Sequence, residues 1–209
     1  MTKNSPVAIR GLYAITPDET DTARLLDLCK MALAGGATVL QYRNKRVSGE
    51  QAREQAQALL AMCRAYRVPL IINDDVELAA KLDADGVHLG IDDGDITAAR
   101  STLGASKIIG ASCYNNLGLA QQAARLGADY VAFGACFPSS TKPHAPRADM
   151  TLFQQARELG VPVVAIGGIT LDNAASVVSA GADAIAVIGA LWNAADIKAQ
   201  ANQFNQLFS

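Results

Sequence analysis

Short apolar segments alternate with longer amphipathic segments along the chain. Each short segment is rich in Val, Ile, Leu and Ala and is followed by polar residues or glycine, as expected for a buried strand that runs into a loop. The longer segments carry apolar residues at helical spacing, for example over residues 22–34, 50–66, 117–126, 152–159 and 195–207. We therefore predict strands at residues 12–15, 38–42, 70–72, 86–89, 107–111, 130–133, 162–166 and 184–188.

Three junctions between a predicted helix and the next strand share one motif. Residues 82–87, 126–131 and 180–185 each contain Asp or Gly, then Ala-Asp, then an apolar run, and residues 35–39 form a looser fourth copy. Asp and Gly can adopt the left-handed conformation that ends a helix. Repetition of this kind indicates one supersecondary unit used several times.

Eight strands that alternate with helices predict a parallel sheet covered by helices. The sheet could be open and doubly wound, or closed. The turn after the first strand, at residues 15–18, lacks the glycines of a dinucleotide-binding open sheet. We therefore predict an α/β fold, an eightfold (β/α)8 TIM barrel, with residues 1–209 as a single domain of short loops. The segment 136–149 is the longest exception, and we expect it to close over a ligand.

In a parallel barrel the functional residues follow the strands, at their carboxyl ends. Gln41, Arg43 and Lys45 end the second strand and share one face, because side chains alternate along a strand. Cations placed at an interior need an anion as partner. The alternative is a strand that ends in solvent with ordinary surface charges.

Carboxylates follow the third and fourth strands. Asp74 and Asp93 would supply hard oxygen ligands of the kind that Mg2+ uses when it also holds a diphosphate. Their neighbours have a structural interpretation, in which Asp75 and Asp95 cap the helices that follow.

Hydroxyls and glycines follow the later strands. Glycines at 167, 168 and 189 suggest exposed backbone amides that could bind a phosphate, although tight turns explain glycine equally well. Nearby hydroxyls would complete such a pocket. His88, inside a strand, and Trp192 are predicted to be packing residues.

Composition narrows the functional classes. Half of the 209 residues are hydrophobic and the net charge is −2 without a long basic run, which argues against a general nucleic-acid surface. No apolar stretch has the length of a signal peptide core or a membrane span, so we expect a cytoplasmic protein. The four cysteines lack metal-ligand spacing and are predicted to be reduced packing residues.

Several motifs together resemble the thiamine phosphate synthase family. They run in order along residues 11–191: the segment 41–45, Asn73-Asp74, and residues 88–93, 110–112, 137–142, 166–169 and 187–189. The resemblance implies an eightfold barrel that binds a pyrimidine diphosphate through Gln41, Tyr42, Arg43, Asn44, Lys45, Asn73, Ser112 and Lys142. It implies magnesium at Asp74 and Asp93, and a thiazole phosphate at Ser139, Ser140, Thr141, Gly168, Ile188 and Gly189.

The resemblance implies a transferase of thiamine biosynthesis with small-molecule substrates and Mg2+ as cofactor. It would join hydroxymethylpyrimidine diphosphate to a thiazole phosphate and release diphosphate, with CO2 as well when the thiazole is carboxylated. Arg43, Lys45, Ser112 and Lys142 would be catalytic, and the mechanism would be dissociative. The alternatives are a thiazole tautomerase of the same family, a phosphosugar enzyme on the same fold, and a non-catalytic phosphate sensor.

Overall fold

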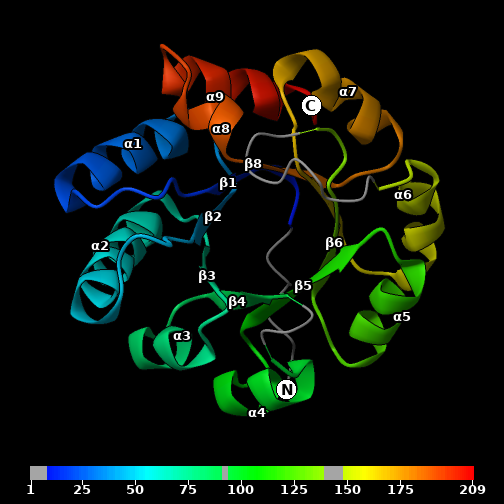
Figure 1. The fold of residues 1–209 in the computed structure, drawn as a ribbon, viewed down its shortest axis with the longest axis horizontal. Coiled ribbons are helices and arrows are strands. Elements are labelled where there is room, and N and C mark those ends of the chain that lie inside the picture. Colours follow the sequence, from blue (N-terminus) through cyan, green and yellow to red (C-terminus); the bar gives the residue numbers. More distant parts are fainter. Residues whose placement is uncertain (1–8, 91–93, 139–147) are drawn as a thin grey trace.

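The structure is a computed structural model that describes residues 9–90, 94–138 and 148–209. Within these ranges, parallel strands β1 to β8 follow one another around a closed barrel, which is completed by pairing of β1 with β8. Helices surround the strands on the outside (Figure 1). The strands are β1 (Gly11–Ile15), β2 (Val39–Tyr42), β3 (Leu70–Asn73), β4 (Gly86–Leu89), β5 (Ile108–Tyr114), β6 (Tyr130–Phe133), β7 (Val163–Ile166) and β8 (Ala184–Val187). The predicted eightfold barrel is confirmed.

The helices also agree with the sequence pattern. The last helix was predicted over residues 195–207 and is observed at Ile197–Gln206, where the carboxylate of Asp196 accepts a hydrogen bond from the Ala199 N–H (2.9 Å). The short helix that directly follows β8 was not predicted. The helices are α1 (Thr22–Ala34), α2 (Gly49–Tyr66), α3 (Val76–Leu82), α4 (Ile96–Leu103), α5 (Leu117–Arg125), α6 (Thr151–Ala156) with a 3-10 turn (Arg157–Leu159), α7 (Leu171–Ser179), α8 (Gly189–Trp192) and α9 (Ile197–Gln206).

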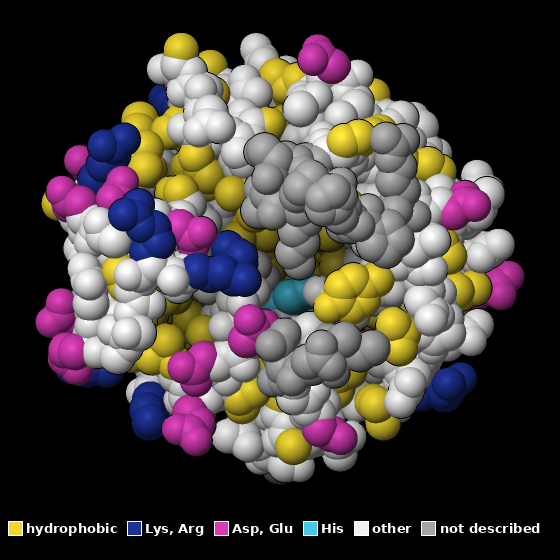
Figure 2. Space-filling model, in the orientation of Figure 1, with side chains coloured by type: hydrophobic (Ala, Val, Ile, Leu, Met, Phe, Trp, Pro, Cys, Tyr) yellow, Lys and Arg dark blue, Asp and Glu magenta, His cyan; other side chains and the backbone are white. Residues whose placement is uncertain are grey.

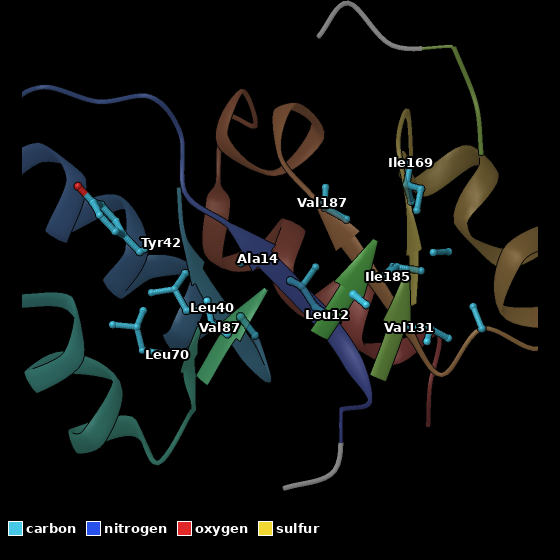
Figure 3. Packing of buried hydrophobic residues seen from close by; sticks show 14 of the residues in the cluster. Leu12, Ala14, Leu40, Tyr42, Leu70, Val87, Val131, Ile169, Ile185 and Val187 are labelled. Atoms are coloured by element: carbon cyan, nitrogen blue, oxygen red, sulfur yellow. The ribbon is translucent and has the colours of Figure 1, made fainter. Parts of the chain in front are cut away.

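The hydrophobic residues form two separate layers. The larger layer lies between the strands and the helices, where side chains such as Leu12, Leu40 and Val187 pack (Figure 3). The smaller one fills the barrel and takes the alternate strand positions, among them Tyr13, Val39 and Ile71, together with Tyr130 and Val164. Burial on both faces explains why the strands are almost continuously apolar in sequence.

The repeated Ala-Asp junctions have one structural role. Asp85, Asp129 and Asp183 each use Oδ2 to accept a hydrogen bond, 2.8 Å long, from a backbone N–H at the start of the preceding strand, at Leu70, Ile109 and Val163 respectively. The residue that ends each preceding helix has positive φ, as predicted: Asp83 (54°), Gly127 (94°) and Gly181 (113°). Each repeat therefore fastens two neighbouring strands at the amino end of the barrel.

The four cysteines, Cys29, Cys63, Cys113 and Cys136, are buried and unpaired with one another. This agrees with their predicted role as packing residues. Among the described residues, no helix combines the length and the apolar character that crossing a membrane requires.

Candidate functional site

The carboxyl ends of the strands surround a cavity of about 1190 Å3. Figure 2 shows this hollow near the centre of one face, with a histidine inside it and both basic and acidic side chains at its edge. Its volume is slightly above the range of about 300–1000 Å3 that is usual for small-molecule sites, so it is large enough for two small ligands. The predicted site residues that line it are Gln41, Arg43, Lys45, Asn73, Asp74, Ser112, Gly168, Ile188 and Gly189.

The segment that ends β2 has one face toward the cavity and one toward the helices. Gln41, Arg43 and Lys45 line the cavity, whereas Tyr42 Oη and Asn44 Nδ2 each donate a 3.0 Å hydrogen bond to Oε1 of Gln55 in α2. This arrangement agrees with the alternation expected from the sequence. Tyr42 and Asn44 therefore fix the strand end to α2, and their side chains lie away from the cavity.

Thr16 and Asp18, which follow β1, hold the backbone of Arg43 and Lys45 in place. Thr16 is fully buried, and its hydroxyl donates to the carbonyl oxygen of Arg43 (2.8 Å) and accepts from the Arg43 N–H (2.9 Å). Asp18 Oδ1 accepts a hydrogen bond from the Lys45 N–H (2.8 Å) and lies 3.6 Å from Nη1 of Arg43. Neither role was predictable from a local pattern, because both contacts join residues that are 27 positions apart.

Asp74 has an unusual backbone conformation at the end of β3. Its φ is 63°, in the left-handed region, and its N–H donates to the carbonyl oxygen of His88 (2.9 Å). Its carboxylate accepts a hydrogen bond from Nδ2 of Asn73 and lines the cavity. Asp75, by contrast, accepts from the Leu78 N–H (2.8 Å) and caps α3, and Asp95 likewise caps α4. Both capping predictions are confirmed.

The carboxylate of Asp74 has oxygen atoms of the kind that bind a hard cation. Mg2+ keeps several waters and uses one or two carboxylates, so a complete protein cage is not required. Among the described residues, no group of three or more His, Cys, Asp or Glu side chains could hold a metal. Asp74 lines the cavity and could supply one such carboxylate, and the predicted second ligand, Asp93, lies outside the described residues.

A chain of hydrogen-bonded polar side chains crosses the inside of the barrel, and its members line the cavity. Gln41 Nε2 donates to Tyr13 Oη (2.9 Å), and the hydroxyl oxygens of Tyr13 and Tyr130 lie 2.7 Å apart. The Tyr130 hydroxyl lies 2.9 Å from Nδ1 of His88, and Nε2 of His88 lies 2.9 Å from Oγ of Ser112. Burial raises the pKa of Tyr13, and it raises that of Tyr130 well above its ordinary value. Both phenols therefore stay protonated near neutral pH.

Sequence reasoning missed the two tyrosines of this chain. Their strand positions place them on the interior face, and a buried tyrosine hydroxyl requires a polar partner, which is the signal that could have identified them. His88 was predicted to be a hydrogen-bonded packing residue, and its ring does stack on Tyr130, with centroids 5.6 Å apart. Ser112 was expected after the fifth strand but lies within β5, which continues past a bulge to Tyr114.

Glycines form the opposite edge of the cavity. Gly167 and Gly168, with φ of 98° and 66°, connect β7 to the start of α7. A Cβ at Gly168 would lie 2.5 Å from the carbonyl oxygen of Pro138, so that position has no room for a side chain. Gly189 begins α8 at the end of β8. Backbone amides on this edge can be approached closely by a ligand such as a phosphate.

Five predicted site residues cannot be placed. Ser139, Ser140, Thr141, Lys142 and Asp93 lie outside the described residues, as does most of the predicted covering segment 136–149. Pro138, which comes directly before the first four, lines the cavity.

Sequence and structure comparisons agree on one family. The family model described as thiamine monophosphate synthase matches residues 12–191. A thiamine-phosphate synthase of Methylobacillus flagellatus is 75% identical over 209 residues, which is 100% of both chains, and one of Chromobacterium violaceum is 57% identical over 94% of this chain and 95% of that one. A solved structure, thiamine phosphate pyrophosphorylase from Pyrococcus furiosus, superposes with a TM-score of 0.85 at 33% identity and covers 96% of each chain.

Proposed function

The chain belongs to the thiamine monophosphate synthase family, and we propose that its cavity makes thiamine phosphate from hydroxymethylpyrimidine diphosphate and a thiazole phosphate. Diphosphate is released, together with CO2 when the thiazole is carboxylated. The observation that carries this proposal is that the Arg43 and Lys45 side chains line the same cavity as the Asp74 carboxylate. A diphosphate needs both kinds of group, cations for its own charge and a carboxylate for the accompanying metal.

The two substrates would occupy opposite edges of the cavity. We assign the pyrimidine diphosphate to the β2, β3 and β5 edge, where Gln41, Asn73 and Ser112 supply hydrogen bonds and the two cations supply charge. The thiazole phosphate is assigned to the glycine edge at Gly168, Ile188 and Gly189. Lys142 would complete the first site, and Ser139, Ser140 and Thr141 would complete the second.

Mg2+ would be held by Asp74 and Asp93. When bound, it would neutralise charge on the diphosphate and so improve that group as a leaving group. Asn73 would keep the Asp74 carboxylate oriented, because its Nδ2 donates to that carboxylate.

We propose a substitution in which the carbon–oxygen bond to the diphosphate breaks before the new bond forms. The electron pair of that bond leaves with the diphosphate, and Arg43 and Lys45 stabilise the charge that develops there. The electron-rich aminopyrimidine carries the resulting cation until the thiazole nitrogen donates its electron pair to the same carbon. The protein positions the reactants and excludes water, which would otherwise capture the cation.

No covalent step on the protein is needed. The buried thiols support this, since burial raises the pKa of Cys113 to about 12 and that of Cys136 to about 11. A reactive cysteine needs a lowered pKa and exposure to substrate. The described cysteines have neither property.

The test is formation of thiamine phosphate and diphosphate from the two purified substrates, with and without Mg2+. We expect equal amounts of the two products, dependence on both substrates and on Mg2+, and loss in an Asp74→Asn variant. Asp27 on α1, which is exposed and does not line the cavity, would be replaced by Asn for comparison. Absence of product while thiazole phosphate still binds would contradict the proposal and favour a tautomerase or a sensor.

A further inference from the structure

We propose that Tyr13, Tyr130 and His88 form an oriented chain of hydrogen bonds that keeps the Ser112 hydroxyl directed into the cavity as a hydrogen-bond donor. This inference rests on the proposed function, in which Gln41 and Ser112 contact the pyrimidine diphosphate. The three residues between them also line the cavity, and we assign them a positioning role because their polar atoms are hydrogen-bonded to one another and to these two ends.

The chain connects five strands across the barrel. Tyr13 comes from β1, Gln41 from β2, His88 from β4, Ser112 from β5 and Tyr130 from β6, and consecutive polar atoms are 2.7 to 2.9 Å apart. All except Ser112 are buried, and Ser112 is half-buried at the cavity. Gln41 and Ser112, on different strands, are thus joined by one continuous path of hydrogen bonds.

Gly110 makes this path possible. A Cβ at this position would lie 2.0 Å from the Tyr130 ring. The missing side chain lets the ring of Tyr130 cross the barrel interior next to β5. A tyrosine that reaches across the interior can contact both the Tyr13 hydroxyl and His88.

The direction of the chain follows from counting donors. Gln41 Nε2 donates to Tyr13, so the Tyr13 hydroxyl has one hydrogen left, and the Tyr130 oxygen is the partner it contacts. The hydrogen of Tyr130 then has Nδ1 of His88 as its acceptor. A buried hydroxyl hydrogen without an acceptor is destabilising, so each donor uses the partner available to it.

This order fixes the tautomer of His88. In a neutral imidazole one nitrogen accepts and the other donates. Because Nδ1 accepts from Tyr130, the proton lies on Nε2, which donates to Oγ of Ser112. The hydrogen of the Ser112 hydroxyl is then left for an acceptor in the cavity, such as a ring nitrogen or a phosphate oxygen of the ligand. The opposite order requires the Gln41 amide to be turned over, and it would put the proton on Nδ1.

The first test is the nitrogen NMR spectrum of the imidazole groups in the ligand-free protein. The protein has two histidines in its sequence, His88 and His144. A His144→Gln variant therefore assigns the signals of His88. We expect a protonated Nε2 and an unprotonated Nδ1 at neutral pH, and a proton on Nδ1 would overturn the inference. The measurement needs no turnover, so its outcome is separate from that of the synthase assay.

The second test is a double-mutant cycle between Tyr130→Phe and Ser112→Ala. Tyr130→Phe removes the donor to His88, and we expect kcat/KM to fall about tenfold, the upper size for one neutral hydrogen bond. In the Ser112→Ala background the same change should lower kcat/KM less than about twofold, since the two residues act in series. Equal losses in both backgrounds would overturn the inference. Tyr66→Phe, at an exposed tyrosine on α2, should leave the kinetics unchanged.

Discussion

The Thr16 hydroxyl pairs with both backbone groups of Arg43, donating to its carbonyl oxygen over 2.8 Å and accepting from its N–H over 2.9 Å. Arg43 lies beyond the last residue of β2, and the Thr16 hydroxyl makes the two backbone hydrogen bonds that a neighbouring strand would make within the sheet. The backbone of Arg43, whose side chain is one of the proposed catalytic cations, is therefore fixed at the point where the sheet ends. Positioning of this kind is needed when catalysis depends on fixed charges.

Replacement of Thr16 by Val should weaken both the fold and the site. Valine has nearly the same shape but leaves two backbone groups of Arg43 without a partner, which costs about 1–3 kcal/mol of unfolding free energy. We also expect a higher KM for the pyrimidine diphosphate. Thr16→Ser keeps the hydroxyl and should retain most of both properties. Urea unfolding and steady-state kinetics measure them, and a valine variant as stable as the parent would contradict this account.

Removal of the charge of Asp18 should strengthen diphosphate binding. Asp18→Asn retains an oxygen for the Lys45 N–H but no longer neutralises Arg43, which lies 3.6 Å away. The pair is partly exposed, so we expect the Kd of inorganic diphosphate to fall about two- to fivefold, the effect of roughly 0.4–1 kcal/mol. Calorimetry at low and high salt would measure it. Weaker binding would mean that Asp18 orients Arg43 more than it competes with the ligand.

Replacement of Gly168 by Ala should weaken binding of the thiazole phosphate at the glycine edge of the cavity. Gly168 and Gly160 have similar φ values, 66° and 69°, but a Cβ at Gly168 would meet Pro138 whereas one at Gly160 would meet nothing within 4 Å. Both alanine variants should lose about 1–2 kcal/mol of stability from the left-handed conformation. Only Gly168→Ala should raise the KM for the thiazole phosphate. Equal KM values in the two variants would contradict the assignment of the phosphate to this edge.

The cysteine thiols should contribute stability that is lost in alkali. Burial raises the pKa of Cys136 from 9.0 to about 11 and that of Cys63 to about 12. Between about pH 9 and pH 11 these thiols lose protons in the unfolded protein but keep them in the folded protein. The free energy of unfolding should therefore fall as the pH rises through this range. Alkylation followed by mass spectrometry should label none of the cysteines at pH 8 until urea is added. Rapid labelling of the folded protein would contradict this.

Much of the fold was predictable from local patterns. The apolar segments located all eight strands, and alternation placed Gln41 and Arg43 on the cavity face. The carboxylates of Asp75 and Asp95 were identified as helix caps for the same reason, because capping is a matter of a few neighbouring residues.

The parts that escaped prediction depend on residues far apart in sequence. Tyr13 and Tyr130 are 117 positions apart and meet because the barrel closes. The extension of β5 depends on a bulge opposite β6. In each case the partner is supplied by tertiary structure, which no periodicity along the chain encodes.

In the proposed mechanism, cations at the end of β2 promote departure of the diphosphate by electrostatic stabilisation. The most direct measurement is the single-turnover rate of thiamine phosphate formation in Arg43→Gln, compared with Arg46→Gln. Arg46 is exposed and does not line the cavity. We predict a fall of about 10²–10³-fold for Arg43→Gln, the size typical of losing one preorganised charge-stabilising group, and no change for Arg46→Gln. Similar rates in the two variants would contradict the claim.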